Sequence, residues 1–320
     1  MNSRSVLCAL FLSAACSDVT HADSFGSGPN AFTIDFVTIG SPGNPADTTG
    51  DPNPAGAVQY SYRIGKYEVP EDAVRKANAI TAAEGNPLGI TLDSRGLNKP
   101  ATSLTWFEVA KFVNWLNTST GAPPAYKFDS AGDFQLWAPG DAGYDPANLF
   151  RNSLARYFMP SADEWYKAAF YDPTTGGYWD YPTGSDSPPI AIASGTAPGT
   201  AVWNQAMLEP AEVTLSGGPS PFGTFGQAAN VLEWEETELD LVNNDPAALR
   251  GQRGGSWIQS ITPLDMSSSF RNSALPRRIP PNVGLRIASV IPEPSSAFLA
   301  GILVVSLGLA RWTLPHAEPH

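Results

Sequence analysis

Hydrophobic residues near the start of the chain fall into two short runs separated by a polar stretch. The apolar run Phe32–Ile39 predicts a strand. Apolar and polar residues partly alternate within Val58–Val69, which predicts a second strand. The intervening stretch Ser41–Ala57 is rich in Gly, Pro and Asp, residues that favour turns. We therefore expect two strands joined by a loop.

Two helices are predicted further along. In Thr105–Asn117 apolar side chains recur three and four positions apart, as on one face of a helix; these are Trp106, Val109, Ala110, Val113 and Leu116. A second helix is predicted to begin at Ser161, because Ser161 and Glu164 have the spacing of a capping box. We expect Pro173 to end it.

The rest of the chain predicts little regular structure. Its 30 prolines and 29 glycines among 320 residues interrupt helices and strands often. Beyond residue 173 the sequence predicts only short strands and loops, and no internal repeat is found. We therefore predict one α+β domain over residues 30–290, with much irregular structure.

The charge balance excludes some classes of partner. The formal net charge is −12, and Lys and Arg form no cluster along the chain. Binding to nucleic acid depends on Lys and Arg that displace counterions from phosphates. Adhesion to anionic lipid headgroups depends on similar basic clusters. We therefore expect no nucleic-acid partner, whereas cation binding stays open.

Cysteine and histidine occur only near the two ends. The cysteines are Cys8 and Cys16, and the histidines are His21, His316 and His320. The central domain therefore has no thiol nucleophile, no imidazole general base and no Ser-His-Asp triad. Zinc and non-haem iron rarely accept an all-oxygen site. Carboxylates, Lys, Tyr and oxygen-ligated ions remain as the chemistry available to the domain.

Residues 1–22 have the pattern of a secretory signal peptide. Arg4 precedes the apolar run Val6–Ala15, and small residues flank His21, so we predict cleavage after Ala22. Two alternatives stay open. The segment could be a buried first helix, or Cys16 could carry a lipid anchor, although Ser13 stands where a lipid-attachment motif has a larger aliphatic residue.

The C-terminal end has a different sequence pattern, which is typical of a sorting signal. Ile291–Pro294 is followed by the apolar stretch Ala297–Ala310 and then by Arg311. About 14 residues are short for a membrane-spanning helix, and a core helix is the alternative. The order of these parts resembles the PEP-CTERM sorting segment, which we place at 291–312, followed by a polar tail at 313–320. The resemblance implies processing by exosortase-type sorting machinery and a stay, transient or stable, of this segment in the membrane.

Six short motifs occur in one order along the chain. They are Ile64–Val69, Trp106 with Trp115-Leu116, Met159–Ala169, Asn230–Trp234, Arg253–Trp257 and Gly284–Ala288. The series resembles the sulfatase-modifying-factor family, whose founding activity is the formylglycine-generating enzyme. The resemblance implies an elaborated C-type-lectin-like α+β fold. The segment Tyr171–Pro182 resembles a branch of the family that commonly carries PEP-CTERM tails.

The resemblance does not extend to the redox centre. The family enzymes have two cysteines after the Gly-Gly-Ser-aromatic motif, and the matching positions here are Gln259 and Leu264. Neither side chain can form a thiolate or ligate Cu(I), which prefers sulfur. We therefore name no catalytic residue and expect no copper.

The resemblance also implies calcium, bound through oxygen atoms near the Asn-x-x-Glu-Trp motif. Asn230 and Glu233 match this motif, and the carbonyls of Ala228 and Val231 could complete the site. Ala229 stands where the family usually has Gly. The alternative is that Asn230 and Glu233 only cap and fix a loop.

Three other features have a structural and a functional interpretation. We predict that the acidic run Glu233–Asp240 is a solvated edge; paired carboxylates for glycoside hydrolysis are the alternative. Aromatic residues in Tyr178–Tyr181 are expected in the core, with a sugar-stacking surface as the alternative. Arg253 and Arg286 lie among apolar residues and are expected to make buried ion pairs or hydrogen bonds.

These observations favour an exported, non-catalytic binding or structural module. We expect it in the cell envelope or an extracellular polysaccharide matrix, where its partners would be polysaccharide or surface proteins. The alternative is a divergent enzyme, either an oxidase of the formylglycine-generating type or a carboxylate-based hydrolase on the same fold.

Overall fold

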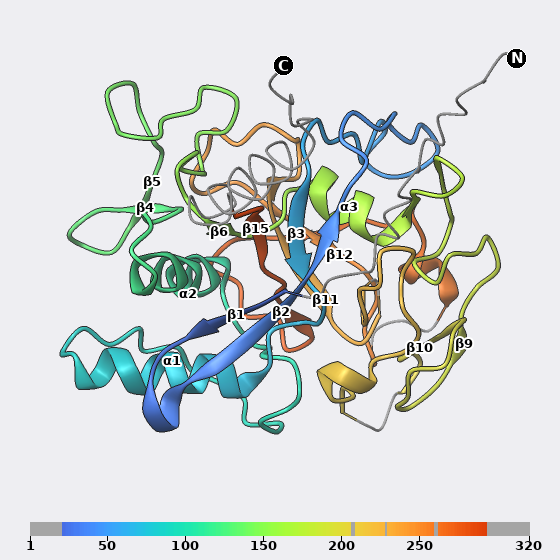
Figure 1. The fold of residues 1–320 in the computed structure, drawn as a ribbon, viewed down its shortest axis with the longest axis horizontal. Coiled ribbons are helices and arrows are strands. Elements are labelled where there is room, and N and C mark those ends of the chain that lie inside the picture. Colours follow the sequence, from blue (N-terminus) through green and yellow to red (C-terminus); the bar gives the residue numbers. More distant parts are fainter. Residues whose placement is uncertain (1–20, 206–208, 228, 259–261, 293–320) are drawn as a thin grey trace, which may run out of the picture.

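A five-stranded antiparallel sheet lies at the centre of the computed structural model, which describes residues 21–205, 209–227, 229–258 and 262–292 (Figure 1). The strand order is β1-β2-β3-β15-β6. Its members are β1 (His21–Phe25), β2 (Phe32–Ile39), β3 (Tyr62–Gly65), β15 (Ala288–Val290) and β6 (Tyr157–Phe158). β15, the last strand of the described residues, therefore pairs between β3 and β6.

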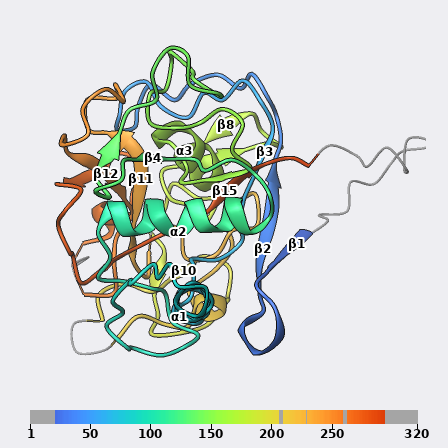
Figure 2. The ribbon, with the colours of Figure 1, turned by 90° about the vertical axis from the view of Figure 1, so that its left-hand side faces the viewer.

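Two helices pack beside this sheet, and a third lies apart from them (Figures 1 and 2). They are α1 (Glu71–Ala83), α2 (Trp106–Ser119) and α3 (Ala162–Phe170). α1 contacts β2, α2 contacts β6, and α3 contacts β11 (Leu232–Glu238). The predicted helices α2 and α3 are confirmed, and capping boxes at Thr105 and Ser161 begin them.

α1 was not predicted from the sequence. Its N-cap is Pro70, which makes no side-chain capping bond. Its buried face consists mainly of small side chains, among them Ala73, Val74 and Ala77. A face of this kind gives a weak apolar stripe, although it suits close packing against β2.

A second sheet has the order β13-β12-β11-β14. β11 pairs antiparallel with β12 (Arg250–Arg253) and parallel with β14 (Val283–Gly284), and β13 (Asn272–Ala274) pairs with β12. The remaining elements are short: β4 (Lys127–Phe128), β5 (Phe134–Gln135), β7 (Tyr171–Asp172), β8 (Gly177–Tyr178), β9 (Ile190–Ala191), β10 (Thr200–Ala201), and the 3-10 turns η1 (Gly28–Asn30), η2 (Val213–Leu215) and η3 (Pro263–Met266). The predicted α+β fold with much irregular structure is confirmed.

Aromatic residues fill the core. Trp106, Trp165, Trp234 and Trp257 are fully buried. The indole N–H groups of Trp106 and Trp234 donate to backbone carbonyls, at 2.9 and 3.0 Å. These bonds fix α2 and the segment before it against β11, because a buried indole N–H without a partner would be costly.

The described part of the chain begins earlier than the domain predicted from residue 30. β1 begins at His21, and Ala22 pairs with Asp35 of β2. The predicted signal peptide and the sorting segment fall almost wholly on 1–20 and 293–320, outside the described residues. Within the described residues, no helix is long and apolar enough to cross a membrane.

Candidate functional site

The carboxylates of β11 are buried, so the prediction of a solvated edge over Glu233–Asp240 is wrong. Glu233 accepts hydrogen bonds from the guanidinium of Arg286, with 2.7 Å between Oε1 and Nη2. Its other oxygen, Oε2, accepts from the indole N–H of Trp165 at 2.6 Å. The run reaches solvent only at its last two residues, Leu239 and Asp240.

Arginines from distant segments neutralise the next two carboxylates. Glu235 pairs with Arg253 at 2.8 Å and with Arg271 at 2.7 Å. Glu236 pairs with Arg151 at 2.7 Å. The sequence pattern of β11 gave no indication of these partners, because each lies far from the strand in the chain. The prediction that Arg253 and Arg286 make buried ion pairs is confirmed.

One pair of carboxylates is close enough to suggest hydrolytic chemistry. Glu164 and Glu236 both bind Nη2 of Arg151, at 2.8 and 2.7 Å. Burial opposes ionisation of Glu164, yet the Arg151 guanidinium holds the pKa of its carboxyl below the usual value. A two-carboxylate glycosidase needs one carboxyl with a raised pKa as proton donor. The pair therefore has the character of a structural ion-pair network.

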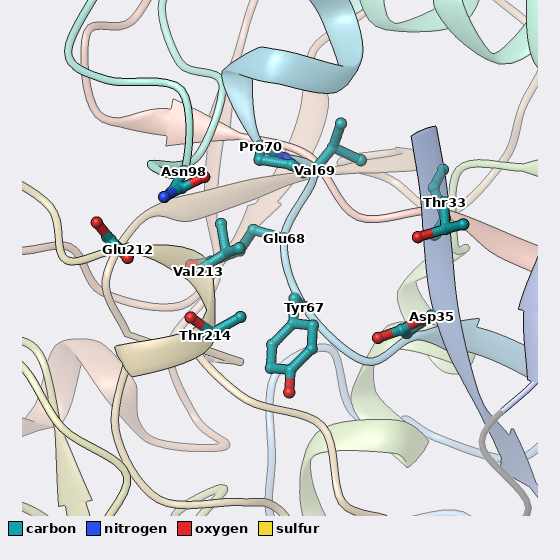
Figure 3. Close-up of a pocket in the computed structure, with 11 residues that line it drawn as sticks. Thr33, Asp35, Tyr67, Glu68, Val69, Pro70, Asn98, Glu212, Val213 and Thr214 are labelled. Atoms are coloured by element: carbon teal, nitrogen blue, oxygen red, sulfur yellow. The ribbon is translucent and has the colours of Figure 1, made fainter. Parts of the chain in front are cut away.

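A cavity of about 370 Å³ opens between β2 and η2. Thr33 and Asp35 of β2 point from one side toward Tyr67, and Glu212–Thr214 forms the opposite side (Figure 3). The segment Tyr67–Pro70 lies between them. Thr33 and Asp35 alternate along β2 with the buried residues Phe32, Ile34 and Phe36, so their side chains reach the cavity from the face of β2 that is turned away from the core.

Backbone hydrogen bonds fix the walls of this cavity. The N–H of Lys66 donates to the carbonyl of Asp35 at 2.7 Å, which ties β2 to the segment that carries Tyr67. The N–H of Val213 donates to the carbonyl of Asn98 at 2.9 Å, which ties η2 to another lining residue. The cavity is therefore preformed, as small-molecule sites usually are.

The acidic side chains of the cavity are of two kinds. Asp35 is half-buried and Glu212 is exposed, and neither carboxylate makes an ion pair or hydrogen bond to another described residue. Glu68 is buried, and both its oxygens accept from Nδ2 of Asn230, at 3.1 and 3.2 Å. Burial raises the pKa of Glu68 well above its usual range.

Asn230 and Gly226 hold Glu68 in place. Asn230 has a φ of 64°, in the left-handed region that asparagine tolerates better than most residues. Its Oδ1 accepts from the N–H of Ala211 at 2.8 Å, which sets the amide so that Nδ2 faces Glu68. Gly226 has a φ of 71°, and a Cβ there would lie 2.8 Å from Oε1 of Glu68. Asn230, the asparagine of the Asn-x-x-Glu-Trp motif, therefore positions the buried carboxyl of Glu68.

These features can be compared with known proteins. A family model described as the sulfatase-modifying factor enzyme 1-like domain matches residues 52–291, about three quarters of the chain. The chain belongs to this family. Among curated proteins no sequence matches it significantly.

Two solved structures share the fold of this sulfatase-modifying-factor domain. Treponema denticola variable protein 1 is 16% identical, with a TM-score of 0.56, and the match covers 86% of this chain and 100% of that one. The crystal structure of CarF is 18% identical, with a TM-score of 0.55, covering 81% of this chain and 99% of that one. At these identities the likeness concerns the fold alone.

Only one of the two positions matched to the family cysteines, Leu264, lies within the described residues. Gln259 falls outside the described residues. Leu264 is in η3, and its side chain is 64% exposed. The aromatic residue of the preceding motif, Trp257, is buried beneath the guanidinium of Arg95, which lies 5.0 Å from the ring centroid. Position 264 therefore presents an aliphatic side chain to solvent.

The residues predicted to bind calcium do not form a suitable set. Oδ1 of Asn230 and both oxygens of Glu233 are engaged by donors, and the guanidinium of Arg286 lies beside Glu233. Val231 is buried in the core, and Ala228 lies outside the described residues. No group of three or more acidic, His or Cys side chains among the described residues could hold a metal ion. Calcium binding stays a prediction that this geometry does not favour.

The aromatic residues of Tyr178–Tyr181 are partly packed into the protein. The ring of Tyr178 lies against Tyr166, and Tyr181 is buried beside Met266. The hydroxyl of Tyr178 donates to backbone carbonyls of the loop before β3, including that of Gly56 at 2.8 Å. The core interpretation therefore holds for these two tyrosines.

Proposed function

We propose that this sulfatase-modifying-factor domain is an exported, non-catalytic binding module. We propose that it is delivered to the cell envelope or to an extracellular polysaccharide matrix. The observation that carries the proposal is Leu264, an exposed aliphatic side chain at a position where the family enzymes have a cysteine. Cys8 and Cys16 are the only cysteines of the chain, and both precede the described residues.

Two lines of reasoning support export and binding. The N-terminal pattern at residues 1–22 is that of a signal peptide, and the PEP-CTERM-like segment at 291–312 would engage exosortase-type machinery. The cavity between β2 and η2 supports binding, because it is preformed and two of its lining carboxylates, those of Asp35 and Glu212, make no ion pair with another residue that the structure describes.

The two enzymatic alternatives, an oxidase of the formylglycine-generating type and a carboxylate-based hydrolase, are not favoured by the residues present. Oxidation of a substrate cysteine by the family mechanism needs thiolates, as metal ligands and exchange partners. Arg151 forms ion pairs with both of the closely spaced carboxylates Glu164 and Glu236, and its guanidinium lowers the pKa of Glu164, so Glu164 is not suited to be the proton donor of a hydrolase.

Incubation with a sulfatase-type cysteine peptide tests the proposal. The purified domain, with and without added copper, should form no aldehyde, as followed by mass spectrometry of the peptide. A variant that combines Gln259→Cys and Leu264→Cys shows how much of a copper-binding centre the fold still supports, and we expect little activity from it. Copper-dependent aldehyde formation by the unaltered domain would overturn the proposal.

A further inference from the structure

We propose that an exposed row of leucines at one end of the second sheet is a docking surface for a second copy of this chain, related to the first by a two-fold axis. The leucine row consists of Leu239, which follows β11, Leu249, which precedes β12, and Leu275, which follows β13. None of these residues lines the cavity between β2 and η2, so the proposal is independent of the binding role proposed above.

The strand registers place the three leucines side by side. The N–H of Leu239 donates to the carbonyl of Leu249 at 2.9 Å, so these two residues stand opposite each other. β12 pairs with β13 through Arg250 and Ala274. At the next position this register sets Leu249 opposite Leu275. Opposed residues of antiparallel strands project from the same face of a sheet, so the three side chains form one row.

The leucine row is exposed to solvent. The exposed fractions are 41% for Leu239, 38% for Leu249 and 57% for Leu275. Leu241 and Val242, in the hairpin that joins β11 to β12, are exposed by 44% and 53%. Single exposed leucines are common on protein surfaces, whereas a contiguous group of them marks an interaction site.

Buried charged side chains hold the hairpin that joins β11 to β12. Oε1 of Glu238 accepts from the N–H groups of Asn244 and Asp245, each at 2.7 Å. The guanidinium of Arg250 donates to three carbonyls of the same hairpin, at 2.7 to 3.2 Å. Both side chains are buried. The hairpin is therefore preorganised, which lowers the entropic cost of docking against a partner.

The charges at the two ends of the leucine row favour a second copy as the partner. Asp240 follows Leu239 at one end, and Arg278 lies shortly after Leu275 at the other end. Both are exposed, and neither makes an ion pair with another residue that the structure describes. About a two-fold axis through Leu249, Leu239 of each copy meets Leu275 of the other. Asp240 of each copy then faces Arg278 of the other, as the self-complementarity of a two-fold interface requires.

The other charged groups near the leucine row are compatible with this arrangement. Arg277 pairs with Asp133 at 3.3 Å, at the rim of a mainly apolar hollow beside Leu275. Asp245 is exposed, and its Oδ1 accepts from the N–H of Ala247 at 2.8 Å. An anionic lipid surface is a poorer partner, because docking would bring the carboxylates of the hairpin against the headgroups.

Sedimentation velocity over a series of protein concentrations tests the proposal. We expect the purified protein to form a dimer as its concentration rises. Leu249→Ser, at the proposed axis, should weaken dimerisation by roughly tenfold or more, because central apolar contacts dominate interface energies. The matched control is Leu264→Ser, which removes an exposed leucine in η3, outside the row, and should leave dimerisation unchanged.

Charge reversal tests the two-fold arrangement itself. Asp240→Arg and Arg278→Asp should each leave the protein monomeric where the unaltered protein is dimeric, because like charges then face each other. A mixture of the two variants should form a mixed dimer, since both end contacts of that dimer join opposite charges. A protein that carries both substitutions should dimerise with itself. Thermal unfolding checks that every variant is folded.

Three results would overturn the proposal. The first is a protein that stays monomeric at its highest soluble concentration. The second is a dimer that survives Leu249→Ser and both charge reversals, because its interface would lie elsewhere. The third is a monomer that binds phosphatidylcholine vesicles through the row, with binding lost in Leu249→Ser.

Discussion

The guanidinium of Arg286 and the carboxylate of Glu233 meet in the core, with 2.7 Å between Nη2 and Oε1 and with both side chains fully buried. Arg286 also donates to the backbone carbonyls of Gly65 and Phe225, each at 2.8 Å. It thereby links the second sheet to the segment that leaves β3. A charge in this position is tolerated only because its partner and its hydrogen bonds are complete.

Glu233→Gln should therefore destabilise the domain. The substitution leaves the Arg286 guanidinium buried without its counter-charge, which typically costs about 3–5 kcal/mol. Urea unfolding measures the difference, with Glu84→Gln as a surface control that should stay within about 0.5 kcal/mol of the unaltered protein. Adding Arg286→Met to Glu233→Gln should restore part of the stability. A loss below about 1 kcal/mol in the single variant would contradict the ion pair.

Glu68 should make stability depend on pH. Its folded-state pKa is raised by burial, so the native state keeps a proton that the unfolded chain has lost. The contribution of Glu68 to the free energy of unfolding is largest below the pKa of about 4.3 that a glutamate has in the unfolded chain. This contribution is lost as pH rises through the raised pKa of the folded state. Glu68→Gln mimics the protonated carboxyl. We expect the variant to be at least as stable as the unaltered protein at pH 8, and the two to converge near pH 4.

Melting temperatures across that pH range are the measurement. The expected curves approach each other on the acidic side and separate on the alkaline side. A variant that is less stable than the unaltered protein at pH 8 would show that the ionised Glu68 carboxylate is favoured in the folded state.

Chelation tests the calcium prediction. An ion that binds only the native state raises its stability by mass action. Because Arg286 and Trp165 engage both oxygens of Glu233, we expect the same melting temperature with chelator and with millimolar calcium. A melting temperature that falls on chelation would show that the predicted ligands rearrange around an ion. In that case, a response that persists in Asn230→Ala would place the ion elsewhere.

Intact-mass analysis of the protein from its native host tests the two terminal segments. We expect a mature chain that begins at Asp23 and lacks the residues beyond Pro294. The carboxylate of Asp23 pairs with buried Arg63 at 2.6 Å and accepts from the hydroxyl of Tyr157 at 2.7 Å. Cleavage after Ala22 therefore leaves Asp23 as the first residue of the mature chain, with its contacts to Arg63 and Tyr157 retained. A chain that extends to His320 would contradict the sorting assignment.

The sequence was most informative where local rules decide the structure. The apolar stripe of Thr105–Asn117, the capping box at Ser161 and the run Phe32–Ile39 depend on neighbours in the chain, and all three elements form as predicted. α1 was missed because small side chains give little periodic contrast. The family was recognised because six motifs occur in order, and the match over residues 52–291 confirms it.

The environment of the charged residues could not be predicted in the same way. Glu235 binds Arg253 and Arg271, which are 18 and 36 positions away in the chain. The acidic run contains no pattern that predicts which residues will be its partners. The cavity combines Asp35, Tyr67 and Glu212 from three segments. Its residues have no shared motif, so only the folded chain brings them together.

The position of β15 has a consequence for how such a chain would reach the exterior. Ala288–Val290 pairs with both β3 and β6, so the central sheet is incomplete until the last described strand is available. Pairing between segments this far apart closes late, because the intervening chain must first be ordered. A polypeptide threaded through a membrane pore with its N-terminus first would have crossed almost entirely before the sheet could close. For the export proposed above, this topology would keep the chain unfolded until late in translocation, and a nascent chain stopped before residue 288 should remain sensitive to protease.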